Sequence, residues 1–487
     1  MTISMNSNTS YLPDPFGIGP GSSIKSLDSV IGYDADGNGG RMSLIGEKLR
    51  KAALHGRPLW TRPWIGPPAW TSGQGVLVGA VRHNASGQWY IASGGGTCGA
   101  NEPVHLTGAA VSDGGVNWTH LGAPAWDPAD DPAAPTLDLT GSASTPAGML
   151  SLDVYANRGL MRFNGCAPEQ YAVTGIRAKV FDSKVGTTRR GGGSITFWSD
   201  APKIGFAAYS SGVAVKIFVD GRPLTADPMF GGSSGNYVST ADWGARKPRL
   251  YEVMSPVGDF YMLGLYITSA DQIWKPSDTT NNVRGVFIGD SYLSGSGYGP
   301  FLHGNSLSGH FGRLIGVDDM WMFGMGGTGL LNTGSSSYYT YRERLPQALA
   351  LAPDAFYIYG STNDGSYTGA ALTTEALAFI DAIRAESDAP IFWFGPMSID
   401  SSGSSTVDAS IAAAVAQRPN SNVFYKSIIT SELPWITGTH NNSGFTWSSN
   451  ISQYISGDAT HPCDKGTMYF AQRMANTYIK DMLPSVL

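Results

Sequence analysis

The feature that most constrains the fold is an alternation of apolar runs and helical patterns, which starts near Val283 and continues to the C-terminus. The apolar runs cover 286–288, 320–323, 355–359, 391–394 and 423–425, and helical periodicity covers 345–351, 374–385 and 407–416. Buried parallel strands read as continuous apolar runs, and their alternation with helices is typical of a sheet covered on both faces. The sequence therefore predicts a three-layer α/β/α, flavodoxin-like domain over residues 283–487.

Loops rich in small and polar residues follow the first three of these strands. They are Gly289-Asp290-Ser291, the glycine-rich stretch 324–329 and the stretch 360–365. The carboxyl ends of parallel strands are where open α/β sheets bind ligands. Near the C-terminus, Asp458 precedes His461 by three residues, just ahead of a final helical segment. A serine, a histidine and an acid are the three parts of an activated nucleophile, so these loops predict nucleophilic catalysis.

These four blocks, in this order, resemble the SGNH, or GDSL, hydrolase superfamily, and the resemblance spans residues 283–487. It implies that Ser291 is the nucleophile, that His461 is its general base and that Asp458 orients the imidazole. It also implies an oxyanion hole made of the backbone N–H groups of Ser291 and Gly326 and the side-chain amide of Asn363. Such preorganised donors are what the tetrahedral intermediate of an ester requires.

The sequence departs from the pattern of that superfamily at a few positions. Tyr292 stands where the family often has leucine, and its side chain is expected only to pack. Ser361 replaces the glycine of the third block, so the backbone of that loop is expected to differ. Gly324 and Gly327 compete with Gly326 as the second oxyanion donor, and Asp364 is expected to be structural.

The N-terminal half differs in composition: many glycines, prolines and tryptophans lie between short runs in which apolar and polar residues alternate. Such runs between turns predict β structure. The predicted parts are an irregular segment (1–57) with a short helix at 42–54, a small β module (58–124), a linker (125–139) and a jelly-roll-like β-sandwich (140–277). The small module resembles a repeat of phage tail fibres and carbohydrate-binding modules, where aromatic rings either stack on sugars or form the core. The sandwich either binds a glycan or braces the catalytic domain.

Composition excludes several classes of function. The net charge of −6 without a basic cluster argues against nucleic acid as a partner. No run is long and apolar enough for a membrane span, and no signal peptide is visible, so a virion-associated or extracellular location stays open. The three cysteines lack metal or redox spacing, and no ligand cluster calls for a metal or another cofactor. Cys463 is expected to be a buried cysteine at a helix start. A homo-oligomer is compatible with the sequence, although no coiled-coil heptads enforce one.

Taken together, these patterns predict a serine esterase that removes short acyl groups, above all acetyl, from a carbohydrate. β modules precede the catalytic domain, as in jelly-roll carbohydrate esterases of the SGNH type, and no amphipathic lid suggests a lipid substrate. The tail-fibre-like stretch suggests a phage or prophage protein acting on a bacterial polysaccharide. Two alternatives stay open: a lipase, thioesterase, arylesterase or acyltransferase on the same scaffold, or a phage receptor-binding protein with an inactive hydrolase domain.

Overall fold

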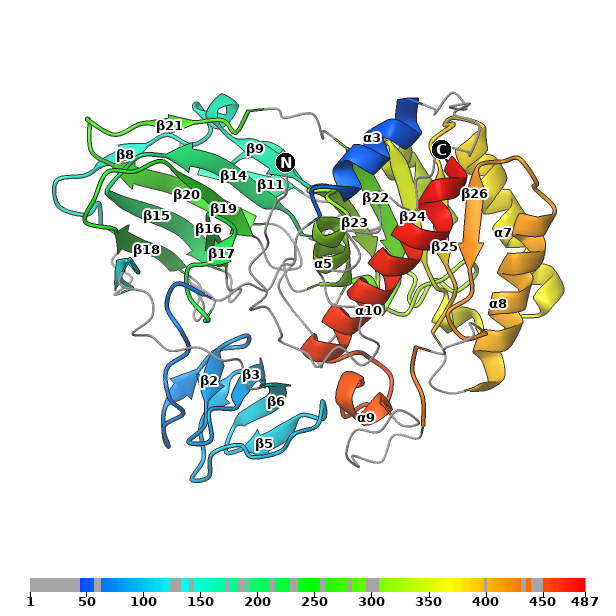
Figure 1. Ribbon diagram of the computed structural model, residues 1–487, viewed down its shortest axis with the longest axis horizontal. Helices are drawn as coiled ribbons and strands as arrows, with labels where there is room; N and C mark the ends of the chain where they lie inside the picture. Colours follow the sequence, from blue (N-terminus) through cyan, green and yellow to red (C-terminus); the bar gives the residue numbers. More distant parts are fainter. Residues whose placement is uncertain are drawn as a thin grey trace, which may run out of the picture.

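The computed structural model describes most of the chain and groups it into a small β module, a β-sandwich and an α/β domain (Figure 1). The described residues are 44–56, 63–122, 133–139, 144–171, 175–179, 181–182, 189–190, 192–210, 215–227, 235–254, 260–277, 283–294, 306–397, 401–430, 435–438 and 450–486. Most of the irregular segment predicted for residues 1–57 lies outside them. The helix expected at 42–54 is present as α3 (Leu44–Ala53).

The five apolar runs of the C-terminal half form five parallel strands of one sheet. Their order across the sheet is β23 (Asp319–Gly324), β22 (Arg284–Gly289), β24 (Ala355–Tyr359), β25 (Ile391–Phe394) and β26 (Val423–Lys426). The first strand in sequence is thus flanked by the second and the third. This order brings the loops after β22, β23 and β24 to one edge of the sheet, where the predicted catalytic blocks lie.

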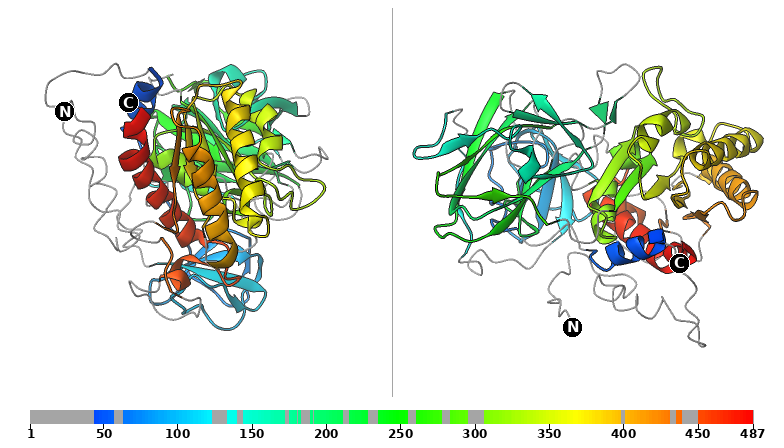
Figure 2. Two further views of the ribbon diagram at one scale, coloured as in Figure 1. Left: turned by 90° about the vertical axis from the view of Figure 1, so that its right-hand side faces the viewer. Right: turned by 90° about the horizontal axis from the view of Figure 1, so that it is seen from above.

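Helices cover both faces of this sheet (Figures 1 and 2). One face carries α3, α5 (Leu307–Leu314) and α10 (Asp464–Thr477), and the other carries α6 (Leu345–Leu349), α7 (Gly369–Arg384) and α8 (Ser401–Ala416). Successive side chains of a strand point to opposite faces, so Phe287 joins the first core while Val286 and Ile288 join the second. Burial of each such side chain contributes about 1.5–3 kcal/mol, which makes β22 a rigid support for the loop that follows it.

Residues 136–274 contain two large antiparallel sheets that enclose one core, and a separate antiparallel pair of β12 (Phe181–Asp182) and β13 (Arg189–Arg190). The first sheet holds β10 (Ala167–Tyr171), β11 (Gly175–Lys179), β20 (Phe260–Ile267), β15 (Lys203–Ser210), β18 (Gly235–Asp242) and β7 (Thr136–Asp138), with β8 (Leu150–Leu152) beside β20. The second holds β17 (Arg222–Pro223), β16 (Lys216–Val219), β19 (Arg249–Met254), β14 (Ser194–Ser199) and β21 (Ile273–Trp274), with β9 (Arg162–Asn164) beside β14. The short strand β7 falls within the predicted linker and pairs with β18, so that stretch is part of the sandwich. A jelly-roll path stays a prediction.

The small β module is a four-stranded antiparallel sheet of β2 (Val81–His83), β3 (Trp89–Gly94), β6 (Val116–Gly122) and β5 (Val111–Asp113), with the pair β1 (Gly75–Val76) and β4 (Gly96–Thr97). Tyr90 and Trp118 are fully buried in its core, while Trp89 packs with Ala226 of the sandwich. Tyr90 and Trp118 thus take the second of the two roles that the sequence left open for the aromatic residues, and sugar stacking by the others stays a prediction. A tail-fibre relationship for this module stays a prediction.

The small module packs against both other parts of the molecule (Figure 1). Arg82 forms an ion pair of 2.7 Å with Asp227 of the sandwich. On the other side, the N–H of Gly108 donates to the carbonyl of Ser452 in α9 (Ile451–Tyr454), at 2.9 Å. The module is therefore anchored close to the segment that carries His461.

No helix in the described ranges is long and apolar enough to cross a membrane.

Candidate active site

Ser291, His461 and Asp458 lie in one chain of hydrogen bonds at the carboxyl end of the parallel sheet. Ser291 is the first residue of the short helix α4 (Ser291–Ser294), two residues after β22 ends. Its Oγ is 2.8 Å from Nε2 of His461, and Nδ1 of the same imidazole is 2.6 Å from Oδ2 of Asp458. The serine and the histidine are half-buried, so a substrate can still reach them. The structure brings together all three residues that the sequence singled out, while their catalytic roles stay predictions.

The carboxylate of Asp458 is held in place by its own loop. Its Oδ1 accepts hydrogen bonds from the hydroxyl of Ser456 at 2.7 Å and from the backbone N–H groups of Thr460 and His461, both at 3.0 Å. Partial burial acts to raise the pKa of Asp458, but the hydrogen bonds from His461 and Ser456 outweigh it and keep that pKa below its ordinary value. An ionised Asp458 favours the tautomer with a proton on Nδ1, which leaves Nε2 free to accept the Ser291 proton.

The predicted oxyanion donors lie just after β22, β23 and β24, and one of them, Gly326, lies beside Ser291. Gly326 faces the nucleophile, because a Cβ built on it would lie 3.5 Å from the Cβ of Ser291. In the described part of the chain, no acceptor is found for the N–H groups of Ser291 and Gly326. Asn363, in the short helix η5 (Thr362–Asp364), donates one amide hydrogen to the carbonyl of Thr328 at 3.0 Å and keeps a second one. The two competing glycines have other nearest neighbours: a Cβ on Gly324 would meet Leu293 and Ser294, and a Cβ on Gly327 would meet Gly334.

The third block is packed tightly against the glycine-rich loop. Asp364 is fully buried, and its carboxylate accepts the backbone N–H groups of Leu330 at 2.6 Å and of Asn332 at 2.8 Å. This is the structural role expected for it. Ser361 is also fully buried, and a Cβ on Gly329 would overlap its hydroxyl. The glycine at 329 therefore leaves room for the serine that replaces the usual glycine at 361.

Arg344 is a supporting residue that the sequence analysis missed. Its side chain is fully buried, and its Nη1 donates to the carbonyls of Gly289 and Phe323, each at 2.6 Å. Its Nη2 also donates to the hydroxyl of Thr328. The guanidinium thus ties the ends of β22 and β23 to the glycine-rich loop. Burial lowers the pKa of Arg344 to about 10, which still leaves it charged at neutral pH. No local motif marks it, because the two strand-end carbonyls that it binds lie far away in sequence.

Tyr292 does more than pack, and the expectation for this residue was incomplete. Its ring contacts Tyr359, with centroids 5.2 Å apart, and lies 5.9 Å from the ring of His461. Its hydroxyl also donates to the backbone carbonyl of Thr460, at 2.5 Å. A leucine has no polar tip and could not make this bond. The residue after the nucleophile is therefore tied to the residue before the histidine.

Two buried titratable residues, Asp290 and Cys463, lie next to the catalytic blocks. Asp290 is fully buried, its Oδ1 accepts the N–H of Tyr292 at 3.0 Å, and burial raises its pKa to about 6. Cys463 is the fully buried N-cap residue of α10, as expected, and burial raises the pKa of its thiol to about 11. A thiol that stays protonated at neutral pH is a poor nucleophile. Among the described residues, no group of three or more His, Cys, Asp or Glu could hold a metal ion.

Comparisons with known proteins give matches in structure only. No protein-family model matches the chain, and no curated protein matches it in sequence. A salicylyl-acyltransferase from a tetracycline biosynthetic pathway aligns with 67% of this chain and 96% of its own, at 13% identity and a TM-score of 0.50. A family two carbohydrate esterase from Clostridium thermocellum, in complex with cellohexaose, aligns with 65% of this chain and 98% of its own, at 16% identity and a TM-score of 0.49.

An acetyl xylan esterase from the rumen bacterium Butyrivibrio proteoclasticus aligns with 68% of this chain and 98% of its own, at 11% identity and a TM-score of 0.46. These identities are low, and of these three structures the salicylyl-acyltransferase alone reaches a TM-score of 0.50, so its likeness concerns the fold alone. The chain itself combines β-rich regions with an α/β region. Its activity has to be argued from its own residues.

Proposed function

We propose that this protein is a serine esterase that removes short acyl groups, above all acetyl, from a carbohydrate such as a bacterial polysaccharide. The observation that carries this proposal is the chain of hydrogen bonds from Ser291 Oγ through His461 to Asp458, at 2.8 and 2.6 Å. Two backbone N–H groups without acceptors in the described chain, at Ser291 and Gly326, support it. The carbohydrate part of the proposal is supported by the β-rich parts that accompany the α/β domain.

The geometry suits acyl transfer in two steps. Ser291 Oγ attacks the ester carbonyl while Nε2 of His461 takes its proton, and Asp458 stabilises the imidazolium. The oxyanion accepts hydrogen bonds from Ser291, Gly326 and Asn363, each worth about 10²- to 10³-fold in rate. His461 then returns the proton to the leaving sugar oxygen. A water molecule attacks the acyl-enzyme by the same route, which releases the carboxylic acid and restores Ser291.

Acetate release from acetylated xylan and from acetylated xanthan tests this proposal. The wild type should release acetate, and Ser291→Ala should lower the rate by about a thousandfold or more. Cys463→Ala is the matched control, because it removes the nearby thiol and should leave turnover largely intact. Equal rates for the wild type and Ser291→Ala would refute serine catalysis.

The same assay separates the remaining alternatives. A lipase, thioesterase or arylesterase would prefer long-chain, thioester or aryl substrates over acetylated glycans. An acyltransferase would pass the acyl group to an added alcohol acceptor faster than to water. A receptor-binding protein with an inactive hydrolase domain would turn over none of these esters while still binding glycan. Each outcome would replace the carbohydrate esterase with the corresponding function.

A further inference from the structure

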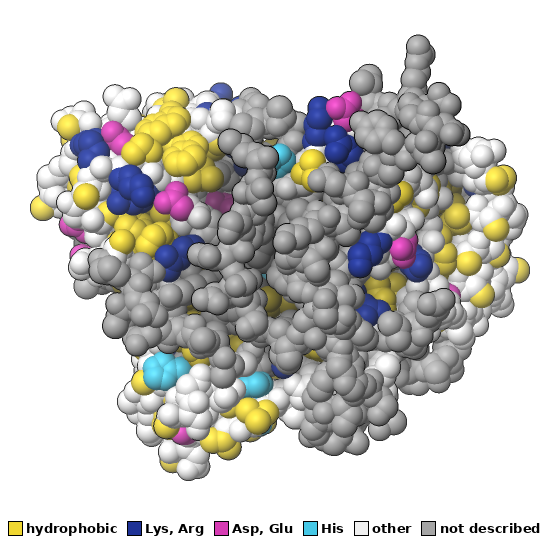
Figure 3. Space-filling view, in the orientation of Figure 1, with side chains coloured by type: hydrophobic (Ala, Val, Ile, Leu, Met, Phe, Trp, Pro, Cys, Tyr) yellow, Lys and Arg dark blue, Asp and Glu magenta, His cyan; other side chains and the backbone are white. Residues whose placement is uncertain are grey.

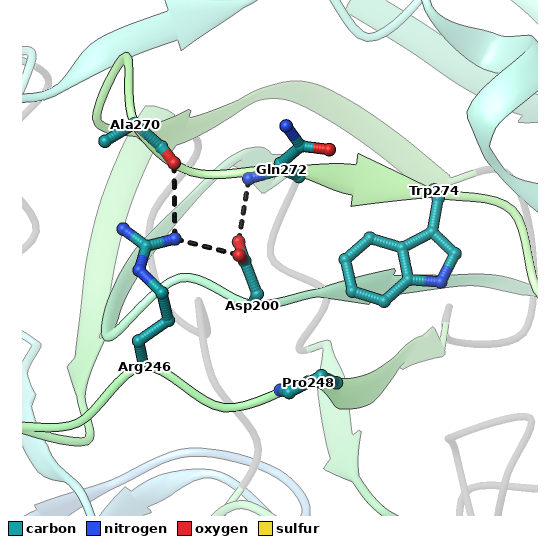
Figure 4. A pocket seen from close by; sticks show the side chains of 6 residues that line it. All are labelled: Asp200, Arg246, Pro248, Ala270, Gln272 and Trp274. Atoms are coloured by element: carbon teal, nitrogen blue, oxygen red, sulfur yellow. Dashed lines mark hydrogen bonds and ion pairs between the residues drawn. The ribbon is translucent and has the colours of Figure 1, made fainter.

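A hollow in the surface of the β-sandwich lies outside the site of Ser291. It occupies about 670 Å³ beside β21, the edge strand of the six-stranded sheet. The residues that line it are Asp200, Arg246, Pro248, Ala270, Gln272 and Trp274 (Figure 4). On this side of the molecule, hydrophobic side chains lie next to charged ones (Figure 3). An apolar wall with a few fixed polar groups is the usual composition of a small-ligand site.

Trp274 forms the apolar wall of the hollow. Its side chain is 37% exposed, more than that of any other tryptophan among the described residues. It stands opposite Trp198 of β14 in the sheet, and the two rings are parallel within 8° with centroids 6.3 Å apart. The neighbouring ring holds Trp274 in one orientation. A tryptophan that is fixed before binding loses little conformational entropy when a ligand stacks on it.

The polar side of the hollow is equally well ordered. The carboxylate of Asp200 accepts Nη1 of Arg246 at 2.9 Å and the backbone N–H of Gln272 at 2.8 Å. Arg246 also donates to Asp271 at 2.5 Å. A carboxylate has about four acceptor positions and a guanidinium has five donors, so both groups keep capacity for a ligand. The side-chain amide of Gln272 is exposed and makes no hydrogen bond to any other described residue.

The charges and the sheet edge exclude two other kinds of ligand. Arg246, the one cation among the lining residues, is already paired with the carboxylates of Asp200 and Asp271, so an anion would meet no unpaired positive charge there. An extended peptide could add to an exposed strand, but β21 has only two residues and Lys275-Pro276 follows it directly. Proline lacks an N–H, and lysine with proline is a usual protection of sheet edges. What remains is a neutral ligand with one apolar face and many hydroxyl groups.

We propose that this hollow binds a short run of pyranose units of a polysaccharide. Trp274 stacks on the apolar face of one sugar ring, and Asp200, Arg246 and Gln272 form hydrogen bonds with its hydroxyl groups. Binding here is independent of catalysis at Ser291. The further role, holding an acylated polymer on the enzyme while its acyl groups are removed, rests on the proposed function.

Affinity electrophoresis of the full-length protein tests the site. Native gels contain one of three neutral polymers, xylan, glucomannan or galactomannan, each freed of acyl groups by alkali so that the ester itself contributes nothing. The wild type should be retarded by at least one polymer, and Trp274→Ala should weaken that binding by about tenfold or more. Gln272→Ala, which removes only an exposed amide, should weaken it by a few fold. Leu150→Ala, on the opposite sheet and 58% exposed, is the matched control and should bind like the wild type.

Three results would overturn the proposal. The first is equal retardation of the wild type and Trp274→Ala, and the second is the absence of retardation in all three polymers. The third is a parallel loss of turnover of a soluble acetyl ester in Trp274→Ala, which would mean that the substitution acts through the fold. The soluble ester also separates the two proposals: if the wild type binds glycan but hydrolyses no ester, the esterase fails while the binding site stands.

Discussion

The bond from Tyr292 to Thr460 allows a sharp test of how the catalytic histidine is positioned. Tyr292→Phe removes one hydroxyl and keeps the ring in its contact with Tyr359. It breaks only the 2.5 Å hydrogen bond to the carbonyl of Thr460, the residue directly before His461. We therefore expect the loop that carries Asp458 and His461 to lose one of its attachments to the nucleophile helix, without a cavity being created.

The size of the effect follows from the environment of this bond. A neutral hydrogen bond contributes about 0.5–1.5 kcal/mol, and Thr460 is exposed, so water can partly satisfy its carbonyl after the change. If that energy holds the histidine loop in its reactive position, kcat should fall about 3- to 10-fold. Burial raises the pKa of Tyr292 well above its ordinary value. Its hydroxyl therefore stays a donor throughout the assay range, and the loss should not depend on pH.

The assay is steady-state hydrolysis of a soluble acetyl ester from pH 6 to pH 9, with thermal unfolding in parallel. Tyr359→Phe is the matched control, since it removes a hydroxyl from the ring beside Tyr292 without touching the histidine loop. The reasoning would be refuted if Tyr292→Phe kept the kcat of the wild type, or if Tyr359→Phe lost as much. A drop in melting temperature alone, with kcat unchanged, would show that the bond stabilises the fold without positioning His461.

Three further predictions concern the acid of the triad, the docking of the small module and a buried carboxyl. Asp458→Asn should lower kcat by about 10³-fold or more with the fold intact, because an amide facing Nδ1 favours the wrong imidazole tautomer; near-normal kcat would contradict that role. Gly108→Val should lower the free energy of unfolding by about 1–3 kcal/mol, and with it the melting temperature and kcat. A Cβ at this position would lie 2.7 Å from the carbonyl oxygen of Gln453 and 2.8 Å from Cys463 Sγ. Gly75→Val, at a position with open space in the same module, is the control. Burial raises the pKa of Asp464 to about 7, so its ionisation costs folding stability as pH rises from about 4 to about 7. Asp464→Asn should therefore raise the melting temperature at pH 8 and change it little at pH 4, and an equal change at both would contradict this.

Local patterns were enough to predict much of the α/β domain. The runs at 286–288 and 355–359 are strands because a continuous apolar segment of that length is stable only when both of its faces are buried. Ser291, Asp458 and His461 could be named because small residues after a strand, and an acid near a histidine, are visible within a few positions. Gly326 and Asn363 were predicted only through the resemblance of their blocks to the SGNH superfamily. The structure brings Asp458, His461 and Gly326 to Ser291, and the amide of Asn363 donates to Thr328 in the glycine-rich loop.

Only the tertiary structure revealed the residues that hold these blocks together. Arg344 donates to carbonyls of Gly289 and Phe323, and Tyr292 reaches a carbonyl of Thr460 far along the chain. The assignment of β7 to the sandwich and the hollow beside Trp274 likewise depend on partners distant in sequence. The sequence by itself determined which segments form strands and which residues can do chemistry, because periodicity and residue type are local. Tertiary structure decided which groups meet, because the local sequence around a backbone carbonyl or an exposed ring does not indicate which distant group will contact it.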